Sequence, residues 1–196
     1  MSGSDPRIAG VLLAAGSGTR FGGHKLLAPW RDGAAVAIAA ARNLIDALPD
    51  CVAVLRPGDE ILASLLAAEG LRIVVNPKAD DGMGTSLARG VVAAAEADGW
   101  VIALADMPVI RPATIQAVAE AIAAGAALAA PVYNGERGHP IGFARRFHAE
   151  LAALKGDRGG RDILAQHANE SRLIEVNDPG VLVDIDREGD IEVSVR

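Results

Sequence analysis

The chain has 196 residues, of which 51% are hydrophobic, 22% are charged and 3% are aromatic, and its formal net charge is −6. This length fits one domain, the apolar content argues against intrinsic disorder, and the acidic balance argues against a general nucleic-acid binder. A single cysteine, Cys51, excludes a disulfide framework and a cysteine-based zinc site, and no apolar run reaches the ~18–20 residues of a membrane span. The short polar start lacks the features of a secretory signal. We therefore expect a cytoplasmic protein of one domain, residues 1–196, with residues 1–7 disordered and with no nucleic-acid or membrane partner.

Apolar runs alternate with helical patterns along the chain. The expected strands are Ile8–Ala14, Cys51–Leu55, Arg72–Val75, Trp100–Ala105, Leu128–Val132, Ile141–Ala144, Arg172–Val176 and Val181–Ile185. The expected helices are Ala35–Leu48, Glu60–Ala68, Ser86–Ala97, Pro112–Ala124, Arg145–Leu154 and Arg161–His167. Strands separated by helices of this length imply βαβ crossovers. The pattern predicts an α/β fold with three layers, a mainly parallel twisted sheet with helices on both faces.

Ligands of open α/β sheets bind beyond the carboxyl ends of the strands, so the segments that follow the strands are the first places to look for a site. These segments are residues 15–31, 56–59, 76–85, 106–110, 134–140 and 184–186.

The segment after the first strand is a glycine-rich basic loop. Between Gly16 and Arg31 the chain carries Arg20, Lys25 and Arg31 and no acidic residue. Glycines let the backbone approach a ligand and aim several N–H groups at one place, and Arg and Lys provide charge that suits phosphate. The loop therefore predicts a polyphosphate ligand, whereas the alternative is a surface loop with incidental charges.

Two common phosphate-binding motifs do not fit this loop. In a P-loop the lysine directly follows a glycine, but His24 separates Gly23 from Lys25. In the dinucleotide fingerprint Gly-x-Gly-x-x-Gly, Phe21 stands where the third glycine belongs, and the next clear helix begins only near Ala35.

Aspartates follow two of the expected strands. Asp106 stands where an apolar strand meets solvent, and the alternation in the last strand places Asp184 and Asp186 on one face, opposite Val183 and Ile185. Magnesium prefers one or two carboxylates together with water and phosphate oxygens. Asp106 and a tail aspartate at the same edge of the sheet would form such a site. Alternatively, these are ordinary strand-end and turn residues.

Three other loops carry candidate ligand contacts. The segment from Asn76 to Ser86 contains Gly82 directly before a helix and could hold a sugar hydroxyl or a base edge through backbone groups. Residues 137–140 (Arg-Gly-His-Pro) place a cation and an imidazole on a turn, and residues 155–161 form a second loop rich in glycine and basic residues. The alternatives are a plain loop, a turn and a helix-to-helix connector.

Taken in order, these segments resemble the molybdenum cofactor (molybdopterin) cytidylyltransferases of the MobA-like NTP transferase family, which have a Rossmann-like nucleotidyltransferase fold of the GT-A-like type. The matching segments are residues 11–16, 20–22, 25–27, 82–87, 103–108, 137–140, 156–161 and 184–186, and the resemblance covers about residues 8–191. The guanylyl branch typically has Gly-Gly in place of Ala14-Ala15, which favours cytosine. The chain departs from the family at Phe21, where Met is common, and at Arg187, where a Thr-Pro step often follows the closing aspartate. The second departure leaves the choice between Asp184 and Asp186 open.

The resemblance implies a Mg²⁺-dependent transfer of CMP from CTP to the terminal phosphate of molybdopterin, with release of pyrophosphate, and possible delivery to a molybdoenzyme or its chaperone. It implies catalytic roles for Arg20, Lys25 and Asp106. It implies nucleotide contacts from Leu13, Ala14, Ala15, Gly16, Ser17, Gly18, Lys25, Gly82 and Ser86. It implies that Asp106 and Asp184 or Asp186 hold the metal, and that Arg137, His139, Asp157, Gly159 and Arg161 face the pterin.

Other functions remain open at this point. A guanylyltransferase or another NTP transferase could act on a different phosphate substrate. An NADP-dependent oxidoreductase is a further alternative, because Arg56 follows the second strand, where a cation suits the 2′-phosphate of NADP. A nucleotide sensor or chaperone without catalytic activity could use the same fold.

Overall fold

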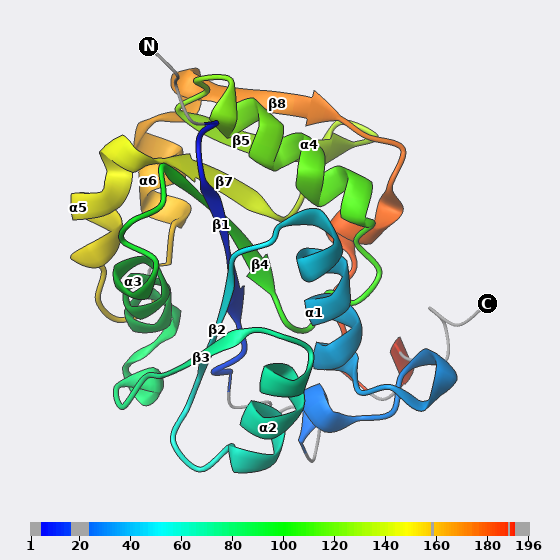
Figure 1. The fold of residues 1–196 in the computed structure, drawn as a ribbon. Helices are drawn as coiled ribbons and strands as arrows, with labels where there is room; N and C mark the ends of the chain where they lie inside the picture. The colour runs from blue at the N-terminus through cyan, green and yellow to red at the C-terminus, as the bar shows by residue number, and fades with distance from the viewer. Residues whose placement is uncertain (1–4, 17–23, 158, 188, 191–196) are drawn as a thin grey trace.

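The computed structural model describes residues 5–16, 24–157, 159–187 and 189–190. Within these residues eight strands form one sheet in the order β3-β2-β1-β4-β7-β5-β6, and β8 pairs with β5 (Figure 1). The strands are β1 (Ile8–Leu13), β2 (Cys51–Leu55), β3 (Arg72–Val75), β4 (Gly99–Leu104), β5 (Leu128–Tyr133), β6 (Glu136–Arg137), β7 (Ile141–Ala144) and β8 (Ser171–Glu175).

Helices cover both faces of this sheet. The α-helices are α1 (Val36–Ala47), α2 (Glu60–Ala68), α3 (Met83–Ala93), α4 (Pro112–Ala123), α5 (His148–Ala152) and α6 (Arg161–Gln166). Short 3-10 helices are η2 (Lys25–Leu27), η3 (Arg31–Gly33), η4 (Ala79–Asp81), η5 (Arg145–Phe147), η6 (Ala168–Glu170) and η7 (Pro179–Leu182).

The core consists of two apolar layers, one on each face of the sheet. Leu12 of β1 packs in the layer that contains residues of α1, α2 and α4, while its neighbour Val11 packs in the layer that contains residues of α3, α5 and α6. Successive side chains of a strand point to opposite faces, so each central strand contributes to both layers. The expected three-layer α/β fold is confirmed.

The direction of the strands determines which ends meet. β1 runs parallel to both β2 and β4, and β2 runs parallel to β3. β7 lies between β4 and β5 and is antiparallel to both. The carboxyl ends of β1 to β4 therefore lie at one edge of the sheet, where the expected site segments begin.

One expected element is wrong. The run Val181–Ile185 is not a strand, because its first residues belong to η7, which Pro179 opens. The buried carboxylate of Asp178 caps this turn by accepting the N–H of Gly180, and it also accepts the N–H of Arg111 at the start of α4. Local capping thus overrides the alternating pattern.

The described start of the chain is attached to the domain. The N–H of Arg7 donates to Asp98, and its guanidinium donates to Asp50. The expected disorder of residues 1–7 stays a prediction, and residues 1–4 lie outside the described residues.

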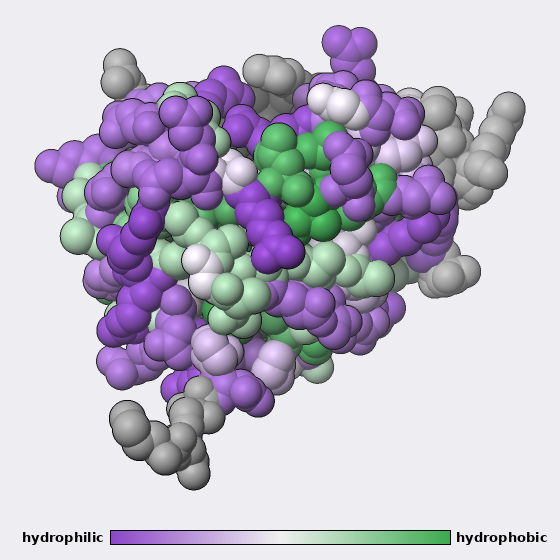
Figure 2. All heavy atoms as spheres, turned by 90° about the horizontal axis from the view of Figure 1, so that it is seen from above, coloured by the Kyte–Doolittle hydropathy of each residue, from purple (hydrophilic) through white to green (hydrophobic). Residues whose placement is uncertain are grey.

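The hydropathy of the helices and of one face of the molecule can be compared directly. None of their helices combines the length and the hydropathy that crossing a bilayer requires. The face shown in Figure 2, the top of the view in Figure 1, carries a limited hydrophobic area surrounded by hydrophilic residues.

Candidate functional site

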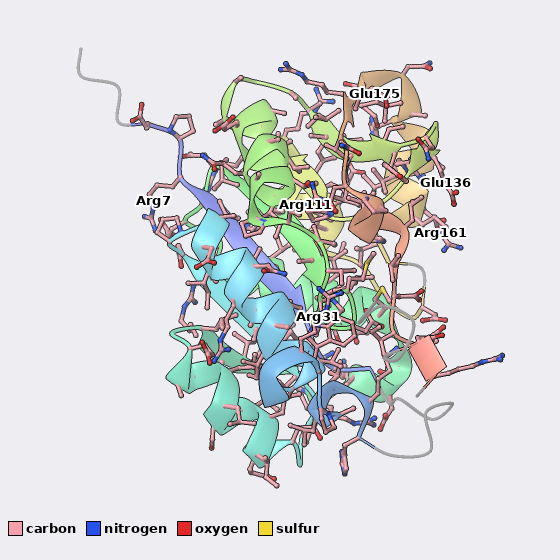
Figure 3. The ribbon with its side chains drawn as sticks, turned by 90° about the vertical axis from the view of Figure 1, so that its right-hand side faces the viewer. Arg7, Arg31, Arg111, Glu136, Arg161 and Glu175 are labelled. Carbon is pink, nitrogen blue, oxygen red and sulfur yellow. The ribbon has the colours of Figure 1, made fainter. Side chains whose placement is uncertain are left out.

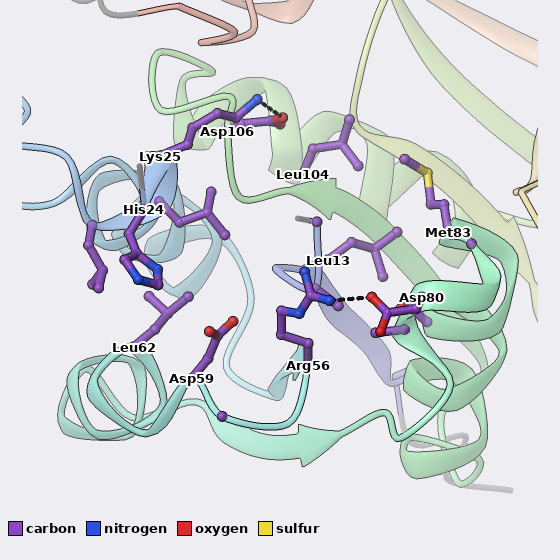
Figure 4. Close-up of a pocket in the computed structure, with 18 of the residues that line it drawn as sticks. Leu13, His24, Lys25, Arg56, Asp59, Leu62, Asp80, Met83, Leu104 and Asp106 are labelled. Carbon is purple, nitrogen blue, oxygen red and sulfur yellow. Dashed lines mark hydrogen bonds and ion pairs between the residues drawn. The ribbon is translucent and has the colours of Figure 1, made fainter. Parts of the chain in front are cut away.

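A cavity of about 820 Å³ opens at the carboxyl ends of β1 to β4 (Figure 4). It brings together many of the expected site residues: nucleotide contacts, the expected metal ligand Asp106 and the expected pterin contact Asp157. These are Leu13, Ala15, Gly16, Lys25, Gly82, Ser86, Asp106 and Asp157. Ala14 is buried in the core instead, where it can act only through its backbone or by packing.

Lys25 links two carboxylates at this edge of the sheet. Its Nζ atom lies 2.9 Å from Oδ2 of Asp106 and 2.9 Å from Oδ1 of Asp186. Lys25 comes from η2, Asp106 directly follows the end of β4, and Asp186 belongs to the C-terminal segment. The side chain of Lys25 is only 11% exposed, whereas that of Asp186 is 46% exposed, so water reaches the cluster from the side of Asp186.

The carboxylates control the charge of Lys25. Burial by itself would lower the pKa of the ammonium group, but the hydrogen bonds and charges of Asp106 and Asp186 outweigh it and raise the pKa above the ordinary value of 10.5. Lys25 is therefore a cation at neutral pH, as phosphate binding requires.

The structure brings Asp186, rather than Asp184, to Lys25. The N–H of Ile185 donates to the backbone oxygen of Asp106 at 2.9 Å, which places the tail segment alongside the end of β4. The Ile185 side chain is fully buried in a small cluster with Trp30 and Val36. Asp184 is exposed to solvent, and among the described residues no hydrogen bond or ion pair joins it to Lys25 or Asp106.

The donor atoms fit a divalent cation that takes few protein ligands. Oδ1 of Asp106 is buried and has no hydrogen-bond partner among the described residues. Those residues contain no group of three or more His, Cys, Asp or Glu side chains that could hold a metal. Asp106 and Asp186 supply two carboxylates, the number that Mg²⁺ uses when phosphate oxygens complete its shell.

The opposite end of the cavity is the start of α3. Gly82 has φ +118°, and the N–H of Gly84 donates to the oxygen of Gly156 at 2.9 Å. An ideal Cβ on Gly82 would lie 2.5 Å from the backbone nitrogen of Asp157. The glycines thus let the 155–157 loop contact the helix backbone directly. Gly159 of the same loop is buried, and an ideal Cβ there would lie 3.6 Å from Sδ of Met83.

The side chain of Ser86 is hydrogen-bonded to the loop between β3 and α3. Its buried hydroxyl accepts a hydrogen bond from the Asn76 amide at 2.9 Å, and the same amide donates to the hydroxyl of Thr85 at 2.9 Å. Asn76 directly follows β3, so it fixes the first turn of α3 to the edge of the sheet.

We expect Gly82→Ala to lower the free energy of unfolding by about 2–4 kcal/mol, because the new methyl group meets backbone atoms in addition to the cost of positive φ. Gly125→Ala is the matched control, since Gly125 has φ +95° but nothing within 4 Å of an ideal Cβ. Gly125→Ala is expected to lower the free energy of unfolding by about 1–2 kcal/mol. Urea unfolding of both variants checks the prediction, and equal losses would show that the contact with Asp157 is not tight.

His139 is close enough to Asp106 for their charges to interact, but it does not line the cavity. The backbone N–H of His139 donates to the backbone oxygen of Val181 at 2.9 Å. The Nδ1 atom of its imidazole is buried and has no hydrogen-bond partner among the described residues. Burial lowers the pKa of the imidazole, Asp106 acts in the opposite direction, and Arg137 and Arg161 lower it further. These charge interactions place all four residues in one neighbourhood, and Figure 3 shows Arg161 on the same side of the molecule as Glu136 of β6.

Because the pKa of His139 is lowered in the folded protein, we expect the folded protein to become less stable as the pH decreases. Below the ordinary pKa of about 6.5, the unfolded chain binds a proton that the folded chain does not, so stability falls as pH decreases until the folded-state pKa is reached. One such group contributes at most about 1.4 kcal/mol per pH unit. We expect His139→Gln to show a smaller loss of unfolding free energy between pH 7.5 and 5.5 than the wild type. Parallel denaturation curves at the two pH values test this, and an unchanged difference would contradict it.

Several charged residues of the cavity were not among the contacts that the family resemblance implies, although Arg56 had suggested the NADP alternative. Arg56, which follows β2, forms an ion pair with Asp80 of η4, and both line the cavity (Figure 4). Asp59 and Glu60, at the start of α2, lie on the same wall. Their place after parallel strands was the only sequence signal for these residues.

The other expected residues of the basic loop, Ser17, Gly18 and Arg20, lie outside the described residues. Their nucleotide-binding and catalytic roles remain predictions.

Two known proteins are similar to this chain over most of its length. The chain is 31% identical over 190 residues to nicotine blue oxidoreductase of Paenarthrobacter nicotinovorans, covering 92% of this chain and 93% of that protein. It is 29% identical to the purine catabolism protein PucB of Bacillus subtilis, covering 92% of each chain.

Solved structures are similar over almost the whole fold. Rv0371c of Mycobacterium tuberculosis has a TM-score of 0.83 at 29% identity, covering 97% of this chain and 98% of that one. A nucleotidyl transferase from Methanothermobacter has a TM-score of 0.81 at 25% identity, covering 97% and 96% of the two chains. A structure of Rv0371c in complex with manganese has a TM-score of 0.72 at 28% identity, covering 88% and 89%.

The family model described as the MobA-like NTP transferase domain matches residues 10–171. This range begins in β1 and ends at the start of β8, so it includes Lys25, Asp106 and the start of α3. The chain belongs to the MobA-like NTP transferase domain family.

Proposed function

We propose that this protein transfers CMP from CTP to the terminal phosphate of molybdopterin and releases pyrophosphate. The observation that carries the proposal is the position of Lys25 between Asp106 and Asp186, at one end of a cavity whose other end is the backbone at the start of α3. A partly buried cation beside two carboxylates suits a triphosphate and a divalent ion.

The charges of the cavity favour one orientation of the nucleotide. The wall formed by the segments after β2 and β3 is lined by Asp59 and Glu60 at the start of α2, and by Asp80, which is paired with Arg56. Carboxylates repel phosphates but accept hydrogen bonds from ribose hydroxyls and from the amino group of a base. We therefore place the triphosphate at Lys25 and the base and ribose near Ala15, Gly82 and Ser86.

In this orientation Lys25 lies at the α-phosphate, where negative charge increases in the transition state. The backbone at Gly16 and the loop that follows it hold the β- and γ-phosphates. The acceptor phosphate oxygen attacks the α-phosphorus, and the bond from that phosphorus to the bridging oxygen of pyrophosphate breaks. A phosphate monoester is already an anion at neutral pH, so the reaction needs no strong general base.

Asp106 and Asp186 would hold the divalent ion. When bound, Mg²⁺ neutralises charge on the phosphate oxygens and fixes their geometry. The complex of Rv0371c with manganese supports a divalent ion in this fold.

The acceptor is placed on the His139 side of Asp106. Arg137 and Arg161 are exposed there and offer cationic donors for a phosphate, and Asp157 and Gly159 belong to the loop that packs on α3. An acceptor phosphate between these groups and the cavity would face the α-phosphate. The pterin itself, and delivery of the product to a molybdoenzyme or its chaperone, follow from the family resemblance.

The test is release of pyrophosphate with molybdopterin as the acceptor. We expect CTP to be used with at least about tenfold higher kcat/KM than GTP, a difference of about 1.4 kcal/mol in the transition state. A preference for GTP would replace the cytidylyl assignment with a guanylyl one. Release that depends on CTP but not on molybdopterin would point to a different phosphate acceptor, which a panel of sugar and alcohol phosphates can identify.

A second function is favoured by one comparison. The relative from Paenarthrobacter is named as an oxidoreductase, and Arg56 lines the cavity after β2, where a 2′-phosphate of NADP would be held. Titration with NADPH, followed by nucleotide fluorescence, separates the two functions. Transfer activity predicts a rise of the unfolding midpoint with CTP and Mg²⁺ and no saturable NADPH signal. Saturable NADPH binding that Arg56→Met weakens would favour the oxidoreductase.

A further inference from the structure

The side-chain amide of Asn76 is held in one orientation by its neighbours. Its Oδ1 atom lies 3.0 Å from the backbone nitrogen of Lys78, which can only donate, so the oxygen faces Lys78 and the NH2 group faces α3. That NH2 group donates one N–H to the hydroxyl of Thr85 and the other to the hydroxyl of Ser86, each at 2.9 Å. Asn76 is only 3% exposed, so water competes poorly for these bonds.

The two hydroxyls differ in where their protons can go. Each oxygen accepts an N–H of Asn76, so each proton needs an acceptor elsewhere. The hydroxyl of Thr85 lies 2.7 Å from the backbone oxygen of Lys78 and 2.8 Å from that of Gly82. For the hydroxyl of Ser86, the described part of the chain shows no acceptor. Ser86 is buried and lines the cavity, so its proton is left for a bound molecule.

We propose that Asn76 is a positioning residue for nucleotide binding. It fixes the Ser86 hydroxyl as a donor toward an acceptor oxygen of the nucleoside, either the 2-carbonyl of the base or the 2′-hydroxyl of the ribose. The identity of the nucleoside rests on the proposed function, which places the base and ribose near Ser86. The direction of the hydroxyl stands on the hydrogen bonds of Asn76 alone. Asn76 does not line the cavity, so it acts through Ser86 and not on the ligand itself.

Asn76→Asp reverses these hydrogen bonds with almost no change in size. One carboxylate oxygen still accepts the N–H of Lys78, but the other can only accept, so the hydroxyls of Thr85 and Ser86 have to donate to it. The Ser86 oxygen then presents lone pairs instead of its proton to the nucleoside oxygen. We expect the Kd for CTP in the presence of Mg²⁺ to rise about five- to tenfold, the effect of losing one hydrogen bond. Isothermal titration calorimetry measures it.

The same substitution in the Ser86→Ala background separates positioning from general effects. Ser86→Ala by itself is expected to raise the Kd by about five- to tenfold, because the donor is gone. Adding Asn76→Asp should then change the Kd by less than about twofold, since no hydroxyl is left to reorient. A merely structural role of Asn76, or repulsion of the triphosphate by the new carboxylate, would weaken binding equally in both backgrounds. Equal weakening would overturn the proposal.

Thr85→Val is the matched control for this cycle. Thr85 accepts from the same amide, but it does not line the cavity, and its proton already has acceptors in the protein. In this background Asn76→Asp should keep its full effect on the Kd. Loss of the effect in Thr85→Val, with the effect retained in Ser86→Ala, would mean that Asn76 acts through the loop and would contradict the proposal.

Asn76→Ala replaces Asn76→Asp in the cycle if the latter does not fold, which circular dichroism shows. Without the amide the Ser86 hydroxyl can rotate, so we expect a loss of CTP affinity of about threefold that disappears in the Ser86→Ala background. A loss that persists there would again contradict the positioning role.

Two analogues identify the oxygen that Ser86 contacts. 2-Thio-CTP has sulfur, a weak acceptor, in place of the base carbonyl oxygen, and 2′-deoxy-CTP lacks the ribose 2′-hydroxyl. We expect at least one of them to bind the wild type severalfold more weakly than CTP, and to bind Ser86→Ala as CTP does. If both proteins discriminate equally against each analogue, the contact with Ser86 is wrong.

These binding measurements can fail separately from the proposed function. A non-additive cycle together with no release of pyrophosphate would support the positioning role and remove CMP transfer. An additive cycle in a protein that transfers CMP would overturn the positioning role and leave the function intact. A wild type that binds neither CTP nor GTP would overturn both.

Discussion

Lys25→Met is expected to reduce kcat/KM for CMP transfer by about 10³-fold while the protein stays folded. The ammonium group is the described cation closest to the two site carboxylates, and its loss removes a charged donor from the α-phosphate. Pyrophosphate release with CTP, Mg²⁺ and molybdopterin measures the effect.

Lys78→Met is the control for this variant, because Lys78 is an exposed lysine that does not line the cavity. It should keep nearly full activity. Full activity of Lys25→Met would contradict the assignment. A wild type that binds CTP with a raised unfolding midpoint, but releases no pyrophosphate with any phosphate acceptor, would instead favour the sensor alternative.

Asp106→Asn is expected to lower turnover by about 10²- to 10³-fold and to weaken metal binding in the presence of nucleotide. The amide keeps the size of the side chain but removes the negative charge next to Lys25, and it leaves a poorer ligand for Mg²⁺. The dependence of turnover on Mg²⁺ concentration provides the measurement. A variant with normal turnover at normal Mg²⁺ would rule out Asp106 as a metal ligand.

The tail aspartates provide a matched pair for the same assay. Asp186→Asn removes the second carboxylate of Lys25, whereas Asp184→Asn removes an exposed carboxylate two residues away. We expect only Asp186→Asn to raise the Mg²⁺ requirement. The reverse result would mean that the tail rearranges when ligands bind.

Short apolar runs bounded by turn residues were enough to locate much of the sheet. The bounds of β2, β3, α2 and β7 are the predicted ones, since each lies between clear breaks in the apolar pattern. What sequence could not provide was the insertion of β7 between β4 and β5, which depends on contacts between distant segments.

The start of α3 shows how a distant contact can shift a boundary. The helix was expected to begin at Ser86 but begins at Met83, in a stretch where Gly82 and Gly84 disfavour helix. The Gly156 oxygen accepts the N–H of Gly84 there, and this partner lies 72 residues further along the chain. A local pattern contains no signal for such a contact.

The candidate site, like the fold, could be predicted from the sequence only in part. The basic loop and Asp106 could be recognised because they follow parallel strands, whose carboxyl ends meet. The choice between Asp184 and Asp186 could not be made, because it depends on burial of Ile185 against Trp30 and on the turn that replaced the expected strand.

The most direct test of the central claim is a crystal structure with CTP and Mg²⁺. The geometry predicts the triphosphate beside Lys25, a metal ion held by Asp106 and Asp186, and cytosine near the start of α3. A nucleotide bound elsewhere, with Lys25 still paired to both carboxylates at saturating CTP and Mg²⁺, would contradict it.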